Sequence, residues 1–366
     1  MDLWNKPWLL PASNNYYYTT CNMGRKPKIV ALFAGCGGLD LGFEQAGFDI
    51  VWANEFDKDI WETYEANHPA HLDRRSITDV SADEIPDCDG IIGGPPCQSW
   101  STGGSKRGLA DKRGQLFYDY IRILSAKNPK FFVAENVKGM LLSRYGTALE
   151  DIKNALREAG TENGYPGYNL YFKCVNAADY SVPEDRERVL FIGIRKDLDI
   201  EYTFPEPTTP EGHRITLKKA IGDLVGFEPM PLPNGITPRD QRNREVPNHE
   251  YMTGGFSSIF MSRNRVRSWD NVGFTVQASG RQAQLHPQAP AMIPTGNNDE
   301  KMFVPGSEYL YRRISVREAA RIQTFPDNFI FHYDNINTGY KMIGNAVPVQ
   351  LAYIIAKSIK KALKNG

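Results

Sequence analysis

The sequence predicts an α/β protein with a doubly wound, mostly parallel sheet and a second, smaller, irregular domain. Between residues 28 and 197, short apolar runs alternate with amphipathic segments, a pattern typical of repeated βα units. From about residue 198 to 314 the chain is rich in Pro, Gly, Asn and Arg, which indicates turns and irregular structure. Helical periodicity returns after residue 315.

Each element follows from its local pattern. Strands are expected where apolar runs end in turn residues, because strands buried on both faces of a parallel sheet are apolar throughout. Helices are expected where apolar residues recur every three or four positions. The expected strands are 28–35, 49–56, 89–94, 130–137, 168–177 and 188–196, and the expected helices are 39–47, 57–68, 114–127, 147–160, 315–325 and 348–364.

These elements divide the chain into three parts. Residues 1–27 form an N-terminal extension, and 28–197 together with 315–366 form a catalytic and cofactor-binding domain. Residues 198–314 form the smaller domain. In such sheets ligands bind at the carboxyl ends of the strands, so functional side chains are expected there.

Composition excludes several classes of protein. The chain has 366 residues, with 43 basic and 43 acidic side chains, so a nucleic-acid surface must be a local basic patch. Its 5 cysteines show no CxxC or Cys/His spacing, which argues against a disulfide framework and against a metal site. A reduced, cytosolic location is expected. No apolar run approaches the roughly 18–20 residues of a membrane span.

The segment "FAGCGGLDLGF" (33–43) joins the first strand to a helix. Its glycines allow a ligand to approach the backbone and the helix N-terminus, although the spacing is not GxGxxG. Glu55 follows Gly35 by twenty positions and ends the second strand, where a carboxylate commonly binds a ribose diol. Together they predict a nucleoside-containing cofactor. The alternative is a tight turn with a solvated Glu.

Cys97 stands in the stiff loop "GGPPCQSWS" (93–101), after the third strand. A thiolate there is a candidate nucleophile, and the alternative is an inert, half-buried cysteine. Glu135 ends the next strand as a candidate acid or hydrogen-bond partner. Arg186 and Arg188 begin another strand, where alternation points both to one face. Each of these three charged residues is equally compatible with a solvated position.

These segments resemble a known family. "FAGCGGLDLGF", "GGPPCQSWS", "AENVKGM", "DRERVLFIG", "REAARIQTFP" and "GYKMIGNAVP" occur in the order found in cytosine-C5 DNA methyltransferases. The resemblance extends from about Lys28 to the C-terminus. It is closest to bacterial type II restriction–modification methyltransferases that recognise GGCC (the HaeIII type), through "FMSRNRVRSWD" and "FTVQASGRQAQLHPQAP" in the smaller domain.

The resemblance implies a Rossmann-like, S-adenosylmethionine-dependent methyltransferase. Cys97 is implied to add to C6 of a flipped cytosine, so that C5 can accept the methyl group, while Glu135 contacts N3. Arg188 is implied to contact O2, with Arg186 nearby. The implied cofactor-binding residues are Phe33, Gly35, Gly37, Gly38, Leu39, Glu55, Phe56, Ser76, Ile77, Pro95, Asn345 and Val347.

Two positions depart from the family pattern. Ser76 stands where the family usually has an Asp that contacts the adenine amine, so cofactor affinity is expected to be reduced. Glu184 stands where the arginine motif normally begins with Gln. A carboxylate near the pocket is expected to alter its water network or its pKa values.

Arginines of the smaller domain predict the partner, double-stranded DNA. Arg263, Arg265, Arg267 and Arg281 stand against a single acid, Asp270, in residues 256–287. Arg reads guanine O6 and N7 in the major groove, and the alternative is contact with phosphates alone. A monomer is expected.

Three other functions remain open. They are an RNA cytosine-C5 methyltransferase, a non-catalytic DNA-binding relic of the fold and, as the weakest, an NAD-dependent oxidoreductase.

Overall fold

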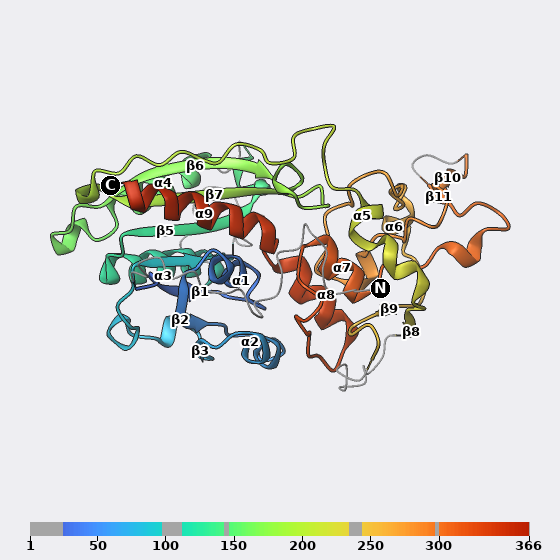
Figure 1. Cartoon of the computed structure of the whole chain (residues 1–366), viewed down its shortest axis with the longest axis horizontal. Helices are drawn as coiled ribbons and strands as arrows, with labels where there is room; N and C mark the ends of the chain where they lie inside the picture. Colours follow the sequence, from blue (N-terminus) through green and yellow to red (C-terminus); the bar gives the residue numbers. More distant parts are fainter. Residues whose placement is uncertain (1–24, 97–111, 143–145, 234–243, 297–299, 366) are drawn as a thin grey trace, which may run out of the picture.

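A computed structural model describes residues 25–96, 112–142, 146–233, 244–296 and 300–365. It has a sheet-containing lobe and a second lobe beside it (Figure 1). The sheet is built from β1 (Lys28–Leu32), β2 (Asp49–Asn54), β3 (His71–Asp73), β4 (Gly90–Gly93), β5 (Phe131–Val137), β6 (Tyr168–Asn176) and β7 (Glu187–Arg195).

The strand order is β3-β2-β1-β4-β5-β7-β6. β1 to β5 are parallel to one another. β7 runs antiparallel to both of its neighbours, β5 and β6. The order steps outward from β1 in both directions, as in a doubly wound sheet. The predicted fold class is therefore confirmed.

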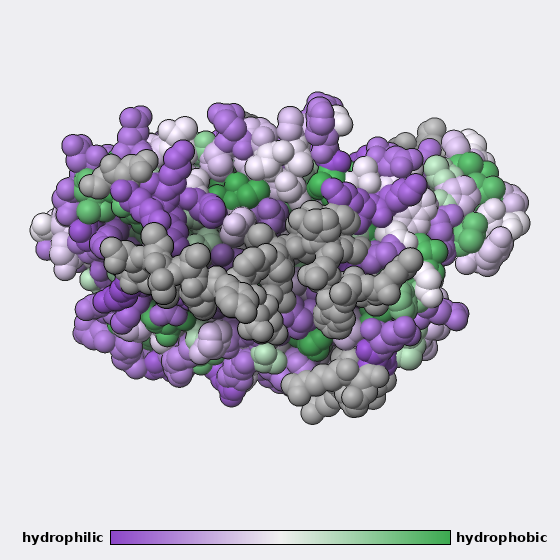
Figure 2. Space-filling view, in the orientation of Figure 1, coloured by the Kyte–Doolittle hydropathy of each residue, from purple (hydrophilic) through white to green (hydrophobic). Residues whose placement is uncertain are grey.

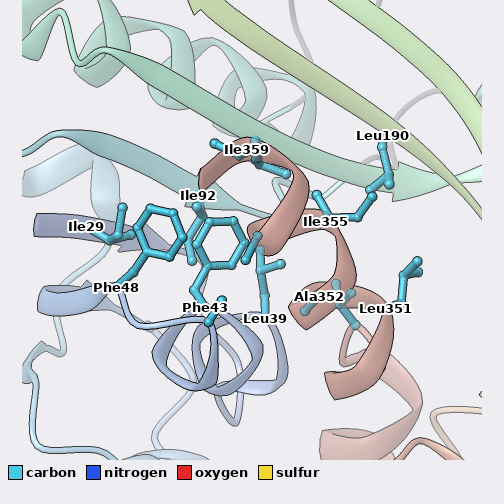
Figure 3. Close-up of a cluster of buried hydrophobic side chains, with 14 of the residues drawn as sticks. Ile29, Leu39, Phe43, Phe48, Ile92, Leu190, Leu351, Ala352, Ile355 and Ile359 are labelled. Atoms are coloured by element: carbon cyan, nitrogen blue, oxygen red, sulfur yellow. The ribbon is translucent and has the colours of Figure 1, made fainter. Parts of the chain in front are cut away.

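Helices cover both faces of this sheet. α1 (Gly38–Gln45) and α9 (Val349–Asn365) pack on one face, and α3 (Lys112–Lys127) and α4 (Gly146–Glu158) on the other. Alternate residues of β1 enter the two cores: Ile29 and Ala31 face α1 and α9, while Val30 and Leu32 face α3. Figure 3 shows Leu39 and Phe43 of α1 packed with Ile355 and Ile359 of α9.

Glycine sets the distance between α1 and α9. A Cβ on Gly42 would lie 2.4 Å from Cβ of Ala352 and 2.7 Å from the Val349 carbonyl oxygen. The C-terminal helix can therefore lie directly on α1 and complete the lobe that begins at β1.

The second lobe contains α5 (Leu217–Ile221), β8 (Met230–Leu232), β9 (Glu250–Met252), α6 (Ser258–Met261), β10 (Ile293–Pro294) and β11 (Lys301–Met302). It also contains α7 (Val316–Ile322) and α8 (Ile336–Asn345), which share a hydrophobic cluster with α5 and β9. Figure 2 shows a mostly hydrophilic face, with apolar surface gathered at the end of this lobe where β10 and β11 lie.

The second lobe therefore includes part of the segment predicted to belong with the sheet. Of the expected 315–366 part, α9 packs on the sheet, whereas α7 and α8 pack on residues of the 198–314 segment. The catalytic and recognition domains as bounded above remain a prediction.

Outside the irregular 198–314 segment, β3 and α8 are absent from the sequence expectations. β3 has only three residues at an edge of the sheet. α8 contains two glycines and two asparagines, which are poor helix formers, yet Tyr340, Met342 and Ile343 are buried. Residues 336–364 are apolar and long enough to cross a membrane, but they form two helices broken near Ala346, and 67% of their apolar window is buried inside the protein.

Candidate active site and cofactor cavity

Four parallel strands bring the predicted site residues to one edge of the sheet. The glycine loop follows β1, Glu55 follows β2, the Pro-Pro loop follows β4, and Glu135 lies near the end of β5. The antiparallel β7 begins at the same edge, with Arg188 opposite Val137. The edge therefore assembles residues that are far apart in sequence.

The glycine loop adopts a left-handed backbone at several positions. Gly35 has φ +57° and Gly37 has φ +88°, and Gly37 is the N-cap of α1. Such φ values strain residues with a Cβ. At Gly37 a Cβ would also lie 2.0 Å from Nε2 of His68, so both conformation and contact require glycine.

Glu55 connects this loop to the next one. Its Oε2 accepts a hydrogen bond from the Gly35 amide at 2.9 Å, and its Oε1 accepts one from the Asp57 amide at 2.7 Å. Burial raises the pKa of Glu55, although these two amides oppose the shift. The carboxylate is thus fixed in orientation and keeps lone pairs for further donors, such as the hydroxyls of a ribose.

A cavity of about 1020 Å³ opens between these loops and the α8–α9 turn. Its volume suits a nucleoside-sized cofactor with space to spare. The predicted residues that line it come from both lobes. They are Phe33, Gly35, Gly38, Leu39, Glu55, Phe56, Ser76, Ile77, Pro95, Glu135, Asn345 and Val347, whereas Gly37 lies behind the cavity wall.

Ser76 occupies the position where the family usually has Asp. Its hydroxyl lies 2.7 Å from that of Thr78, and both residues line the cavity. The nearest preceding carboxylate, Asp73, is paired with Arg75 at 2.7 Å. The cavity is therefore lined by hydroxyls at this point.

Glu135 and Arg188 form a close pair at the other part of the cavity. Nε of Arg188 lies 2.8 Å from Oε1 of Glu135, and the two side chains are 12% and 11% exposed. The adjoining loop is anchored by Asn136, whose Nδ2 donates to the Pro95 carbonyl at 3.0 Å. Cys97 itself lies outside the described residues.

Arg186 lies apart from Arg188. It is 1% exposed, and its Nη2 donates to the carbonyls of Gly344 and Ala346 at 2.8 and 2.9 Å. These carbonyls end α8 and lack helical partners there. Arg186 therefore braces the α8–α9 turn, whereas Arg188 pairs with Glu135, and neither arginine is among the residues that line the cavity.

Glu184 is also structural in its contacts. It is fully buried, and its Oε1 accepts a hydrogen bond from the Val276 amide at 2.6 Å and lies 3.4 Å from Nη1 of Arg186. Burial raises its pKa, with Arg186 opposing. Glu184 joins the start of β7 to the second lobe and does not line the cavity.

The four predicted DNA-binding arginines fall into two pairs. Arg263 and Arg281 are exposed. Arg265 is 7% exposed and donates to the carbonyls of Phe260 and Ile259 at 2.8 and 3.0 Å. Arg267 lies over the Phe274 ring and 3.6 Å from Asp185. Arg263 and Arg281 are therefore exposed, Arg267 is partly exposed (34% of its side chain), and Arg265 is buried.

Several cavity residues escaped the sequence reasoning. Among them, Lys341 of α8 pairs with Asp57, and Asn136 follows Glu135 in the cavity lining. Lys341 precedes the predicted Asn345 by four positions, so a helix through this segment would have placed both on one face. This helix, α8, was not predicted because its two glycines are poor helix formers.

Comparison with known proteins agrees with this geometry. The family of C-5 cytosine-specific DNA methylases matches residues 27–361. The chain is 56% identical to the type II methyltransferase M.FnuDI of Fusobacterium nucleatum, over 92% of this chain and 95% of that one. It is 55% identical to M.NgoPII of Neisseria gonorrhoeae, over 92% and 96% respectively.

Solved structures show the same architecture. A candidate DNA modification methyltransferase encoded within an E. coli prophage superposes with a TM-score of 0.67 and 25% identity, over 93% of this chain and all of that one. The S. pombe Dnmt2 methyltransferase, at 20% identity over 92% and 99%, shares the fold with a TM-score of 0.61. The chain therefore belongs to the family of C-5 cytosine-specific DNA methylases and is a DNA methyltransferase.

Proposed function

We propose that this enzyme transfers a methyl group from S-adenosylmethionine to C5 of a cytosine in duplex GGCC. The observation that carries the proposal is a single cavity. Its lining includes the glycine loop and Glu55 at one part and Glu135, which is paired with Arg188, at another. A nucleoside cofactor and an extruded base can therefore share one enclosed space.

The residues present fit S-adenosylmethionine. Glu55 offers its fixed carboxylate to a ribose, Phe56 offers an exposed ring beside it, and Gly35 and Gly38 leave the backbone accessible. When bound, the cofactor supplies an electrophilic methyl group. Ser76 and Thr78 line the same cavity and would contact the adenine of the cofactor.

The chain's own groups then act on cytosine. The Cys97 thiolate adds to C6, which makes C5 nucleophilic toward the methyl group. A base then removes the C5 proton, and the C6–S bond breaks to release the thiolate and restore the C5–C6 double bond. Glu135 holds N3 of the ring as charge develops there. Arg188 fixes the orientation of Glu135 and, as the resemblance implies, contacts O2 of the base. The base must leave the helix, because C6 is inaccessible in a stacked duplex.

The sequence read is proposed to be GGCC. The support is the resemblance across residues 260–290, together with the exposed Arg263 and Arg281, since Arg is the commonest reader of guanine. Methylation of such a site would protect DNA from a cognate restriction endonuclease.

Bisulfite sequencing of DNA from cells that express the protein tests activity, site and target base together. We expect 5-methylcytosine in GGCC with the wild type and with C174A, a matched cysteine variant on β6, and none with C97A. Methylation of GGCC by C97A at the wild-type rate would contradict the assignment of the nucleophile. No 5-methylcytosine with the wild type, or methylation only of transfer RNA in a parallel assay, would contradict the proposed function.

A further inference from the structure

A group of buried or partly buried polar side chains lies beside the glycine loop, and one of them, Asp40, also lines the cavity. Asp40 and Glu44 belong to α1, and Tyr64 and His68 belong to α2 (Trp61–Asn67) and the residue that ends it. None of the four was predicted as functional. Asp40 is 1% exposed, and the His68 side chain is 0% exposed.

These side chains form two linked pairs. The Tyr64 hydroxyl donates to Oδ2 of Asp40 at 2.7 Å. Nδ1 of His68 lies 3.2 Å from Oε2 of Glu44. The His68 ring stacks on Tyr64, with centroids 4.5 Å apart, and meets the edge of Phe329 at 5.8 Å. The imidazole is therefore held on three sides.

Its fourth side faces the glycine loop. Nε2 of His68 lies 2.0 Å from the point that a Cβ on Gly37 would occupy. Within the described ranges no well-aligned hydrogen bond reaches this nitrogen, although the backbone of Cys36 interacts with the ring as a hydrogen-bond partner. A buried polar atom without a well-aligned partner is costly, so its position against the Cys36–Gly38 backbone calls for an explanation.

Charge gives that explanation. Burial alone would lower the pKa of His68, but the hydrogen bond and charge of Glu44, the charge of Asp40 and the backbone of Cys36 raise it above its usual value. Burial raises the pKa of Asp40 to about 6, although His68 and Tyr64 oppose the shift. From the remaining contact, Phe329, no charge faces the ring. These interactions therefore favour the charged form of the imidazole more than in a free histidine.

We propose that His68 is a positioning residue for the cofactor site, holding the Cys36–Gly38 turn in the left-handed conformation that the cavity requires. Gly38 and Asp40 line the cavity directly, and the Gly35 amide is the donor that fixes Glu55. A turn that relaxed toward His68 would disturb these contacts. The inference rests on the proposed S-adenosylmethionine site, because it concerns the support of that site.

Calorimetric titration of S-adenosylmethionine into the whole enzyme, from pH 5.5 to 8.5, tests the proposal. H68F keeps the stacking on Tyr64 but removes both ring nitrogens. We expect its affinity for the cofactor to fall about tenfold at pH 7, because the turn that carries Gly35 and Gly38 loses a polar support worth on the order of 1 kcal/mol, while its affinity for duplex DNA stays unchanged. E44Q keeps the imidazole ring but removes the charge that raises the pKa of His68. The affinity of E44Q for the cofactor should therefore fall at a lower pH than that of the wild type.

H286F is the matched control. His286 is another fully buried imidazole, 3.4 Å from Glu318 in the second lobe, and its loss should leave cofactor affinity unchanged. A folded H68F with wild-type affinity and the wild-type pH profile would overturn the proposal, as would an equal loss in H286F. If H68F does not fold, an unmoved pH profile in E44Q would overturn it. A wild type that binds no S-adenosylmethionine contradicts the proposed function instead.

Discussion

Arg188 and Glu135 approach to 2.8 Å across the antiparallel pairing of β5 and β7. Both side chains are about one-tenth exposed, so the pair is partly desolvated and its electrostatic attraction is stronger than in water. Arg188 occupies one carboxylate oxygen, Oε1. The other, Oε2, faces Gly94, whose missing Cβ would lie 3.3 Å away. The pair thus presents one oriented oxygen beside the loop that leads to Cys97.

Replacing Glu135 should therefore affect the chemical step more than binding. We expect E135Q to lower kcat about 10²–10³-fold, the usual cost of removing one group that stabilises developing charge, with cofactor affinity unchanged. R188A should produce a similar loss by freeing Glu135, and R188K should recover part of it. Single-turnover methylation of GGCC duplex measures these effects.

E187Q is the control for this prediction. Glu187 begins the same strand but pairs with Lys138 at the surface, so its replacement should leave kcat unchanged. A wild-type kcat in E135Q would show that the carboxylate has no part in the reaction.

The buried pair Glu184–Arg186 should govern stability instead. Arg186 also binds three carbonyl oxygens, those of Val276, Gly344 and Ala346, so we expect R186M to destabilise the fold by about 3–5 kcal/mol. E184Q keeps the acceptor for the Val276 amide and should cost less than about 1 kcal/mol at pH 7. Equal losses in urea unfolding would mean that the carboxylate, not the carbonyls, holds Arg186.

E184Q also tests how the free energy of unfolding depends on pH. Because the pKa of Glu184 is raised in the folded state from its ordinary value of 4.5, the folded protein binds this proton more tightly than the unfolded chain does. Its contribution therefore opposes folding increasingly as pH rises from about 4.5 through the raised value. We expect the free energy of unfolding of E184Q to depend less on pH across that window than that of the wild type. Identical slopes would contradict the assignment.

The sequence predicts the sheet lobe well and the interlobe contacts poorly. β1, β4 and β5 are continuous apolar runs, which the sequence shows directly. Because these strands pair in parallel, their carboxyl ends lie at the same edge of the sheet. The position of the Arg186 side chain depends on hydrogen bonds to carbonyls 158 and 160 positions away. A local sequence pattern cannot predict such distant contacts. Arg265 is similar: its position in an Arg-rich segment suggests DNA, yet its guanidinium binds the carbonyls that end α6.

Ser76 gives a prediction about cofactor affinity. In S76D a carboxylate would replace the hydroxyl that now meets Thr78 and would accept a hydrogen bond from the adenine amine. A hydrogen bond to a charged group is worth roughly 1.5–3 kcal/mol, so we expect about tenfold tighter binding of S-adenosylmethionine by calorimetry. S76A should change little. Unchanged or weaker binding in S76D would mean that another acceptor already serves the amine.

The arginines of the second lobe predict how the DNA sequence is read. Arg263 and Arg281 are exposed, so R263A and R281A should each lose about 1–3 kcal/mol of discrimination at one base pair, the value of a bidentate contact to guanine. Arg265 supports the Ile259 and Phe260 carbonyls. R265A should therefore lower the Tm of the protein in the absence of DNA.

We would measure the binding of each variant to GGCC and to single-base substitutions at two salt concentrations. These measurements distinguish contacts to bases from contacts to phosphates. A lost phosphate contact weakens all duplexes alike and reduces the salt slope by about one unit, whereas a lost base contact relaxes one position. R157A, on the exposed surface of α4, is the control and should match the wild type. If R263A and R281A weaken every duplex equally, these side chains bind phosphates, and the bases must be read by other residues of the second lobe.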